Sequence, residues 1–157
     1  MNLPLKVGAL AAPVAVLAAG AALLVWSGGG AGAAQLKIND AYVREPANPD
    51  EAAAYFTIAN DGGTADTLTK VASSTGRASL HETVGPKMVA LASAPVPAHG
   101  TLDFSPGGSH LMIDDPGPLT PGTKVRLTFT FAASAPITVT VPVIGIADPA
   151  PGRSSGQ

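Results

Sequence analysis

The chain lacks cysteine and has few aromatic and few charged residues. Of its 157 residues none is cysteine, 4% are aromatic and 13% are charged, about half of the charged fraction usual in soluble proteins. The absence of cysteine excludes disulfides and metal sites built on thiolates. A net charge of -2, with no basic patch and so few aromatic rings, argues against binding to nucleic acid.

Glycine and proline are abundant instead, with 18 and 15 residues. They favour short strands joined by tight turns, and no segment beyond Trp26 repeats apolar residues at helical spacing. The expected strands are 36–43, 53–60, 67–73, 77–84, 88–93, 101–105, 109–113, 124–131 and 137–143. We therefore predict an all-β fold, an antiparallel two-sheet sandwich with Greek-key connections.

The N-terminus has the pattern of an export segment. Residues 7–26 carry no charge, follow Lys6 and precede a Gly/Ala-rich stretch, so they predict a hydrophobic helix that is a signal peptide or an uncleaved membrane anchor. The expected organisation is this segment with its linker over 1–34, a folded β-sandwich over 35–147 and a disordered tail over 148–157. The protein is expected to be secreted, periplasmic or anchored to the outer face of the cytoplasmic membrane.

Histidine and methionine form one spaced pattern. His81 is followed after six residues by Met88, then after twenty-one by His110, and after one more by Met112. Because successive side chains of a strand point to opposite faces, His110 and Met112 share a face. Imidazole nitrogen and thioether sulfur suit Cu(I) better than Zn(II). We predict a Cu(I) site made by these four residues, with Gly85-Pro86 turning the chain so that Met88 returns beside His81.

Other interpretations remain open at this stage. The third histidine, His99, lies in a proline-rich turn, where it is either a solvated residue or an assistant to the site. The chain could also be a metal-free secreted β-sandwich that acts in adhesion or surface interaction. An enzyme is not expected, because the G-x-S-x-G and H-E-x-x-H motifs are absent.

Several segments between Leu36 and Val143 resemble one family, the periplasmic copper-chaperone domain PCuAC, a cupredoxin-like β-sandwich. They are Ala41-Tyr42-Val43-Arg44, Ala53 to Asn60, Leu80-His81-Glu82-Thr83, Ser105 to Met112, Pro118 to Gly122 and Leu127 to Phe131. The resemblance implies that His81, Met88, His110 and Met112 hold the copper, although the gap before Met88 is shorter than usual in the family, as a shortened hairpin would explain. It also implies delivery of Cu(I) to the binuclear copper centre of cytochrome c oxidase, in subunit II, often beside a Sco-type thioredoxin-like partner.

Overall fold

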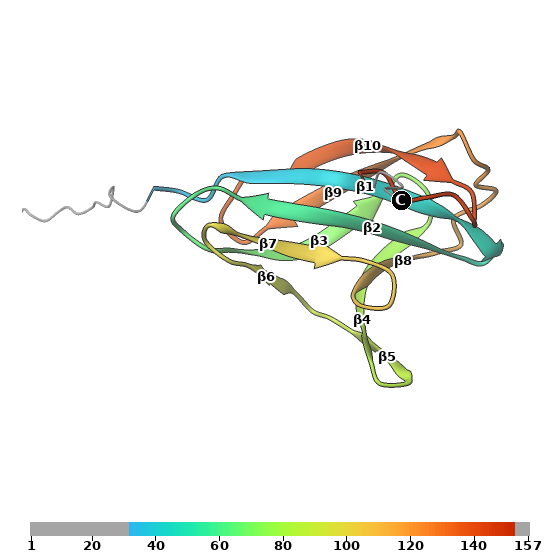
Figure 1. Ribbon diagram of the computed structural model, residues 1–157, viewed down its shortest axis with the longest axis horizontal. Coiled ribbons are helices and arrows are strands. Elements are labelled where there is room, and N and C mark those ends of the chain that lie inside the picture. Colours follow the sequence, from blue (N-terminus) through green and yellow to red (C-terminus); the bar gives the residue numbers. More distant parts are fainter. Residues whose placement is uncertain (1–31, 153–157) are drawn as a thin grey trace, which may run out of the picture. The chain divides into compact units, whose positions relative to one another are not determined.

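The computed structural model describes residues 32–152, and in this range the chain is built from strands (Figure 1). The strands are β1 (Leu36–Asn48), β2 (Glu51–Asn60), β3 (Asp66–Ser73), β4 (Arg77–Val84), β5 (Lys87–Ala90), β6 (Ala94–Val96), β7 (Gly100–Phe104), β8 (His110–Asp114), β9 (Lys124–Phe131) and β10 (Ile137–Ile144). Within the described range, no helix is both long and apolar enough to cross a membrane. The hydrophobic helix predicted over 7–26 lies outside the described residues.

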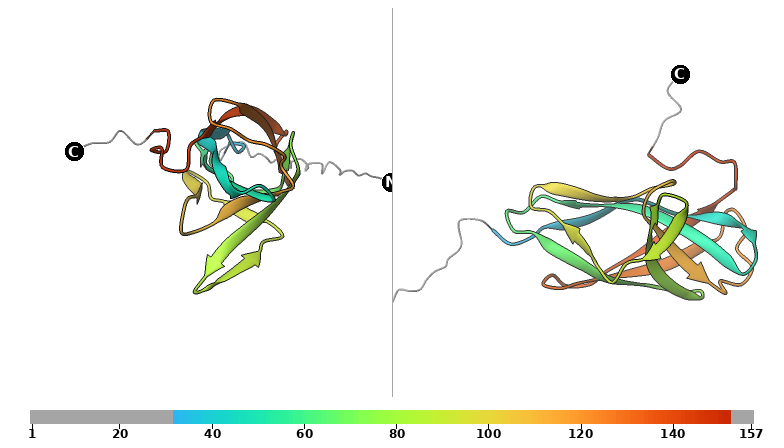
Figure 2. Two further views of the ribbon diagram at one scale, coloured as in Figure 1. Left: turned by 90° about the vertical axis from the view of Figure 1, so that its right-hand side faces the viewer. Right: turned by 90° about the horizontal axis from the view of Figure 1, so that it is seen from below.

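The strands form two layers that join along one edge. The order is β5-β4-β8-β2-β1-β10-β9-β3-β6, and β7 pairs with β2 beyond the end of β8. Viewed from one end, the strands wrap around a shared interior, while the hairpin of β4 and β5 projects from the body (Figure 2). The predicted sandwich is confirmed, and the hairpin that carries Met88 stands at one edge of it.

Alternating apolar residues fill the space between the layers. In β2 the side chains of Phe56 and Ile58 are almost fully buried while their neighbours along the strand are half exposed. Phe56 stacks on Phe104 with ring centroids 4.6 Å apart, and its ring meets that of Phe129 in the other layer edge to face at 4.8 Å. This packing holds the two layers together and leaves the outer face of each layer for polar residues.

The structure corrects the prediction in three places. The pairing of β1 with β10 is parallel, because β10 reaches β1 from the other layer rather than through a hairpin that would force the opposite direction. β1 also continues past Val43 to Asn48, since an irregularity between Arg44 and Asn48 lets the strand accommodate Pro46. The short strand β6, centred on Pro95, was expected to be a turn, but it lies at a sheet edge, where proline is tolerated.

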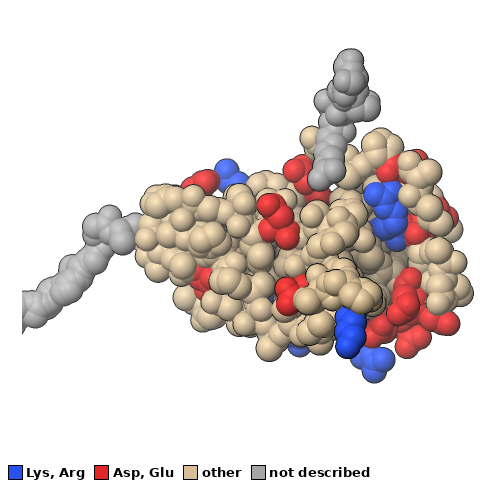
Figure 3. Space-filling view, turned by 60° about the horizontal axis from the view of Figure 1, so that its bottom comes forward, with Lys and Arg blue, Asp and Glu red and all other residues tan. Residues whose placement is uncertain are grey.

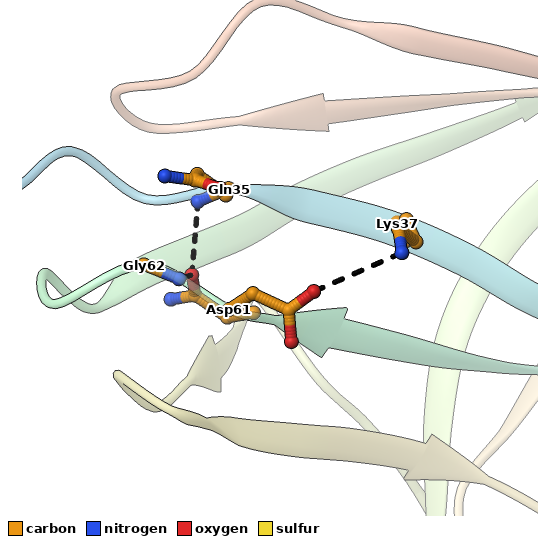
Figure 4. Close-up of polar contacts among 5 residues, drawn as sticks. Gln35, Lys37, Asp61 and Gly62 are labelled. Atoms are coloured by element: carbon orange, nitrogen blue, oxygen red, sulfur yellow. Dashed lines mark hydrogen bonds and ion pairs between the residues drawn. The ribbon is translucent and has the colours of Figure 1, made fainter.

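A buried amide fixes the end of the β1–β2 pair. Asn60 is 1% exposed, and its Oδ1 accepts hydrogen bonds from the backbone N–H groups of Gln35 (3.0 Å) and Gly62 (2.9 Å). At the surface beside it, Lys37 Nζ lies 3.8 Å from the Asp61 carboxylate (Figure 4). The Asn60 side chain thus provides a hydrogen-bond acceptor for backbone N–H groups that would otherwise lack a partner at the end of the strand.

Charged side chains are sparse on the surface. On the face shown in Figure 3 uncharged residues predominate, and the charged side chains lie in small groups, of which several red and blue ones adjoin toward the right of the view. This agrees with a charged fraction of 13%.

Candidate metal centre

The predicted ligands lie on the outer face of the layer formed by β4, β8 and β2. In β8, Leu111 and Ile113 are 0% exposed and enter the core, so His110 and Met112 project from the opposite face. β4 pairs with β8 in antiparallel register, which places His81 directly opposite His110. Alternation therefore predicted the face correctly, and strand register brings the two histidines together.

The two imidazole rings are stacked. Their centroids are 5.8 Å apart and their planes differ by 16°. His81 Nε2 lies 3.0 Å from the hydroxyl of Ser79, which occupies the same face of β4. His81 Nδ1 is buried and has no hydrogen-bond partner among the described residues. A buried polar atom without a partner is costly unless something else binds it.

Met88 approaches from the projecting hairpin. It pairs with Thr83, which is on the same face of β4 as His81, and its Sδ lies 2.8 Å from His110 Nε2. The Met88 side chain is 53% exposed, whereas His110 is only 9% exposed. The hairpin thus returns Met88 to the histidines as predicted, but its contact is with the nearly buried His110, and the residue opposite His81 in β5 is Ala90.

Met112 lies one step along the same face. It is half-buried, opposite Ser79 of β4 and Ala53 of β2, and two residues along a strand correspond to about 6.6 Å. Its side chain lines a hollow of about 480 Å³, to which Arg44 and Ile146 also contribute. Met112 therefore shares the outer face with His110 and His81, but the hollow that its side chain lines includes none of the other three predicted ligands.

The donor set fits soft Cu(I) rather than a harder ion. Two imidazoles and two thioethers are neutral donors of the kind that Cu(I) prefers. Within residues 32–152 there is no group of three or more His, Cys, Asp or Glu side chains that could hold a metal ion. His99, the remaining histidine, is exposed, and its backbone N–H donates to the carbonyl of Gly62 (3.1 Å).

A tyrosine and arginine cluster beside the site was not foreseen. The rings of Tyr42 and Tyr55 are 5.4 Å apart, and the Arg44 guanidinium lies 5.3 Å from the centre of the Tyr42 ring. Burial, reinforced by Tyr42, raises the pKa of Tyr55 in spite of the opposing effect of Arg44. These residues line a second pocket, of about 400 Å³, together with residues 149–152. In the sequence, only the strand alternation that puts Tyr42 and Arg44 on one face could have indicated this cluster.

Arg44 also ties the C-terminal segment to the sheet. Its Nη1 donates to the carbonyls of Gly145 (2.9 Å), Ile146 (3.1 Å) and Asp148 (2.7 Å). The Asp148 carboxylate accepts a hydrogen bond from the Gly145 N–H. The part of the predicted tail over 148–152 is thus in contact with the strands, and 153–157 lie outside the described residues.

Comparison with known proteins relates the chain to one family and one fold. The model of the family described as "Putative lipoprotein LpqE-like" matches residues 36–143. A relative from Leifsonia xyli subsp. xyli, "Putative lipoprotein Lxx21020", is 33% identical over 115 residues, which are 69% of this chain and 69% of the relative.

Solved structures of PCuAC domains share the fold. The copper-bound PCuAC domain from PmoF2 superposes with a TM-score of 0.60 at 23% identity, covering 70% of this chain and 92% of that domain. Apo-DR1885 from Deinococcus radiodurans gives a TM-score of 0.56 at 23% identity, with 89% of this chain and 95% of that one covered. Its Cu(I) form gives 0.50 at 26% identity, with 67% and 74% covered. The resemblance to the PCuAC domain is confirmed in the fold, and by its family match the chain belongs to the LpqE-like family.

Proposed function

We propose that the protein is an extracytoplasmic carrier that binds one Cu(I) ion through His81, Met88, His110 and Met112. The observation that carries this proposal is the contact of His110 Nε2 with Met88 Sδ at 2.8 Å, beside a stacked His81 whose Nδ1 is buried and has no partner within residues 32–152. Nitrogen and sulfur donors from three strands meet there on one face of the sheet. The names of structural neighbours, a copper-bound PCuAC domain and a Cu(I) form, give the same metal.

The chemistry of the site suits transport rather than catalysis. Four neutral ligands leave the bound ion with its positive charge, so a recipient that offers thiolates attracts it by both softness and charge. Ligand exchange can then proceed one donor at a time, and no bond of a substrate is made or broken. In this proposal copper is the cargo, and the protein is not an enzyme.

The site of action is outside the cytoplasm. The uncharged segment 7–26 would serve as export signal or membrane anchor. Relatives are described as putative lipoproteins, but this chain has no cysteine to carry a lipid, so the segment itself would anchor it. The proposed recipient, supported by the PCuAC resemblance, is the binuclear copper centre in subunit II of cytochrome c oxidase. A Sco-type protein is the proposed partner in this delivery.

The test is retention and spectroscopy of copper. The full-length chain in detergent is loaded with Cu(I) under anaerobic reducing conditions, desalted and examined by metal analysis and X-ray absorption. We expect about one copper per chain with both nitrogen and sulfur scatterers. Met88→Leu and Met112→Leu should each remove one sulfur scatterer, and His99→Ala should change nothing.

Two results would contradict the proposal in different ways. Loss of all copper on desalting would remove the carrier function and favour a metal-free adhesion module. An unchanged sulfur signal in Met88→Leu would remove that residue from the ligand set, although Met88 is the thioether seen in contact with a histidine.

A further inference from the structure

We propose that His81 binds copper through Nδ1, and that Ser79 is the positioning residue that keeps this nitrogen available. The inference rests on the proposed function and adds which atom of each histidine faces the metal. It assigns a positioning role to Ser79, which is not one of the four predicted ligands. His110, by contrast, is assigned to bind through Nε2.

The environment of His81 distinguishes its two ring nitrogens. Nε2 lies 3.0 Å from Ser79 Oγ, and Nδ1 is buried without a partner in the described part of the chain. A neutral imidazole has one N–H donor and one lone pair. If Nε2–H donates to the serine oxygen, the lone pair is on Nδ1, and the atom that lacks a partner is the one that can bind a cation.

Ser79 is held in place by the sheet. It precedes His81 by two residues, so both side chains project from the same face of β4, and it lies opposite Met112 of β8. Leu80, which lies between Ser79 and His81 in the chain, is 4% exposed and anchors this part of β4 in the core. The hydroxyl is therefore carried by a rigid strand between one predicted ligand and another, where it can fix both the tautomer and the tilt of the His81 ring.

In His110 the ring nitrogen held by another group is Nδ1, whereas in His81 it is Nε2. Its Nδ1 lies 3.5 Å from the carbonyl oxygen of Gly108, which can only accept a hydrogen bond, so Nδ1 must carry the proton in that contact. The lone pair is then on Nε2, the atom 2.8 Å from Met88 Sδ. In each histidine a group two residues earlier in the chain binds one nitrogen and leaves the other for the metal.

The loss of the Ser79 hydroxyl should weaken copper binding without removing a ligand. Partners that orient ligating histidines typically contribute about 10-fold to 100-fold in metal affinity. We expect Ser79→Ala to raise the Kd for Cu(I) about tenfold, and Ser79→Thr, which keeps the hydroxyl, to restore binding. Ser93→Ala is the matched control, because Ser93 is exposed in the segment between β5 and β6.

The decisive measurement is the state of each ring nitrogen. Full-length chain labelled with [15N]histidine is compared with and without Cu(I) by long-range 1H–15N correlation, which separates protonated, unprotonated and metal-bound nitrogens. We expect His81 to bind through Nδ1 with Nε2 protonated, and His110 to show the reverse. His99, exposed and away from both rings, serves as the reference signal within the same sample.

The outcomes separate this inference from the proposed function. Cu(I) bound through His81 Nε2, or full affinity in Ser79→Ala measured by chelator competition, would overturn the role of Ser79 while leaving the carrier intact. Failure of the wild-type chain to retain Cu(I) would overturn the proposed function itself. If Ser79→Ala does not fold, the wild-type spectrum still decides which nitrogen binds.

Discussion

Replacing Asp66 by asparagine should destabilise the domain without affecting the proposed copper site. The Asp66 carboxylate is 5% exposed at the start of β3, and it accepts hydrogen bonds from the backbone N–H groups of Thr67 (2.7 Å), Ala133 (3.0 Å) and Ser134 (2.9 Å). The Ser134 hydroxyl also donates to it. One acidic side chain thus fastens the connection between β9 and β10 to β3.

The magnitude follows from the geometry of an amide. Asparagine has one oxygen where aspartate has two, so Asp66→Asn leaves at least one backbone N–H facing an NH₂ group, whichever way the amide is turned. A buried donor left without an acceptor costs about 1–3 kcal/mol, and we expect a loss of about 2 kcal/mol in the free energy of unfolding. For a domain of this size that lowers Tm by about 8 °C.

The effect should depend on pH. Burial alone would raise the pKa of Asp66, but the hydrogen bonds from Ser134, Thr67 and Ala133 outweigh it and lower the pKa below its ordinary value of 3.8. The carboxylate therefore stabilises the fold fully above the unfolded-state pKa, and this contribution is lost as the pH falls through the lower, folded-state value. The stability difference between wild type and Asp66→Asn should narrow in acid.

Thermal and urea unfolding of both proteins over a range of pH would test this. Asp61→Asn is the matched control, because its carboxylate is in an exposed ion pair with Lys37 at 3.8 Å and should contribute less than about 0.5 kcal/mol. The reasoning is refuted if the two variants lose the same stability, or if the difference for Asp66→Asn is equal at about pH 6 and about pH 2.

Three further changes test other parts of the domain. Leu111→Ala opens a cavity in the core directly behind the ligand strand, where Leu111 is 0% exposed, and should cost about 2–5 kcal/mol in urea unfolding. Gly76→Ala should cost about 3 kcal/mol by the same measurement, because Gly76 has a φ of +69° and an added Cβ would collide with the carbonyl oxygen of Asp114. Arg44→Ala removes three hydrogen bonds to the C-terminal segment and should speed hydrogen exchange of the Gly145 amide about tenfold.

Each of these variants has a matched control variant that lacks the burial, steric contact or hydrogen bonds of the tested position. Leu102→Ala alters a leucine that is only partly buried, and Gly107→Ala alters a glycine of similar φ with open space around it. Arg126→Ala removes an exposed arginine from β9. If Leu102→Ala or Gly107→Ala lost as much stability as Leu111→Ala or Gly76→Ala, the burial or the steric contact would not be the cause of that loss. If Arg126→Ala sped exchange of the Gly145 amide as much as Arg44→Ala, the hydrogen bonds of Arg44 would not be the cause of the protection.

Much of the fold could be predicted because alternation is a local signal. The bounds of β4 and β9 agree with the expected segments, since both strands alternate regularly and end at clear turns. The parallel pairing of β1 with β10 could not be predicted in this way, because alternation is the same for either direction. The strand around Pro95 was missed because its proline signals a turn unless the strand is known to lie at an edge.

The candidate site was predictable in its residue types and faces but not in its contacts. Spacing placed His110 and Met112 on one face, and Gly85-Pro86 indicated the hairpin that returns Met88. The opposition of His81 to His110 depends on the register between strands that are distant in sequence. The contact of Ser79 with His81 depends on side-chain orientation, which no sequence pattern specifies.

In the proposed carrier, the position of Met88 on the outermost strand of its layer has a consequence for copper release. β5 pairs only with β4 among the described strands, and all four of its residues are exposed. Bending this short flap outward would break no pairing between the other strands, so the sulfur of Met88 can withdraw while both imidazoles keep their places. If the proposed carrier function holds, an incoming thiolate should first take the coordination position that Met88 leaves, so the proposed recipient would approach from the side of β5.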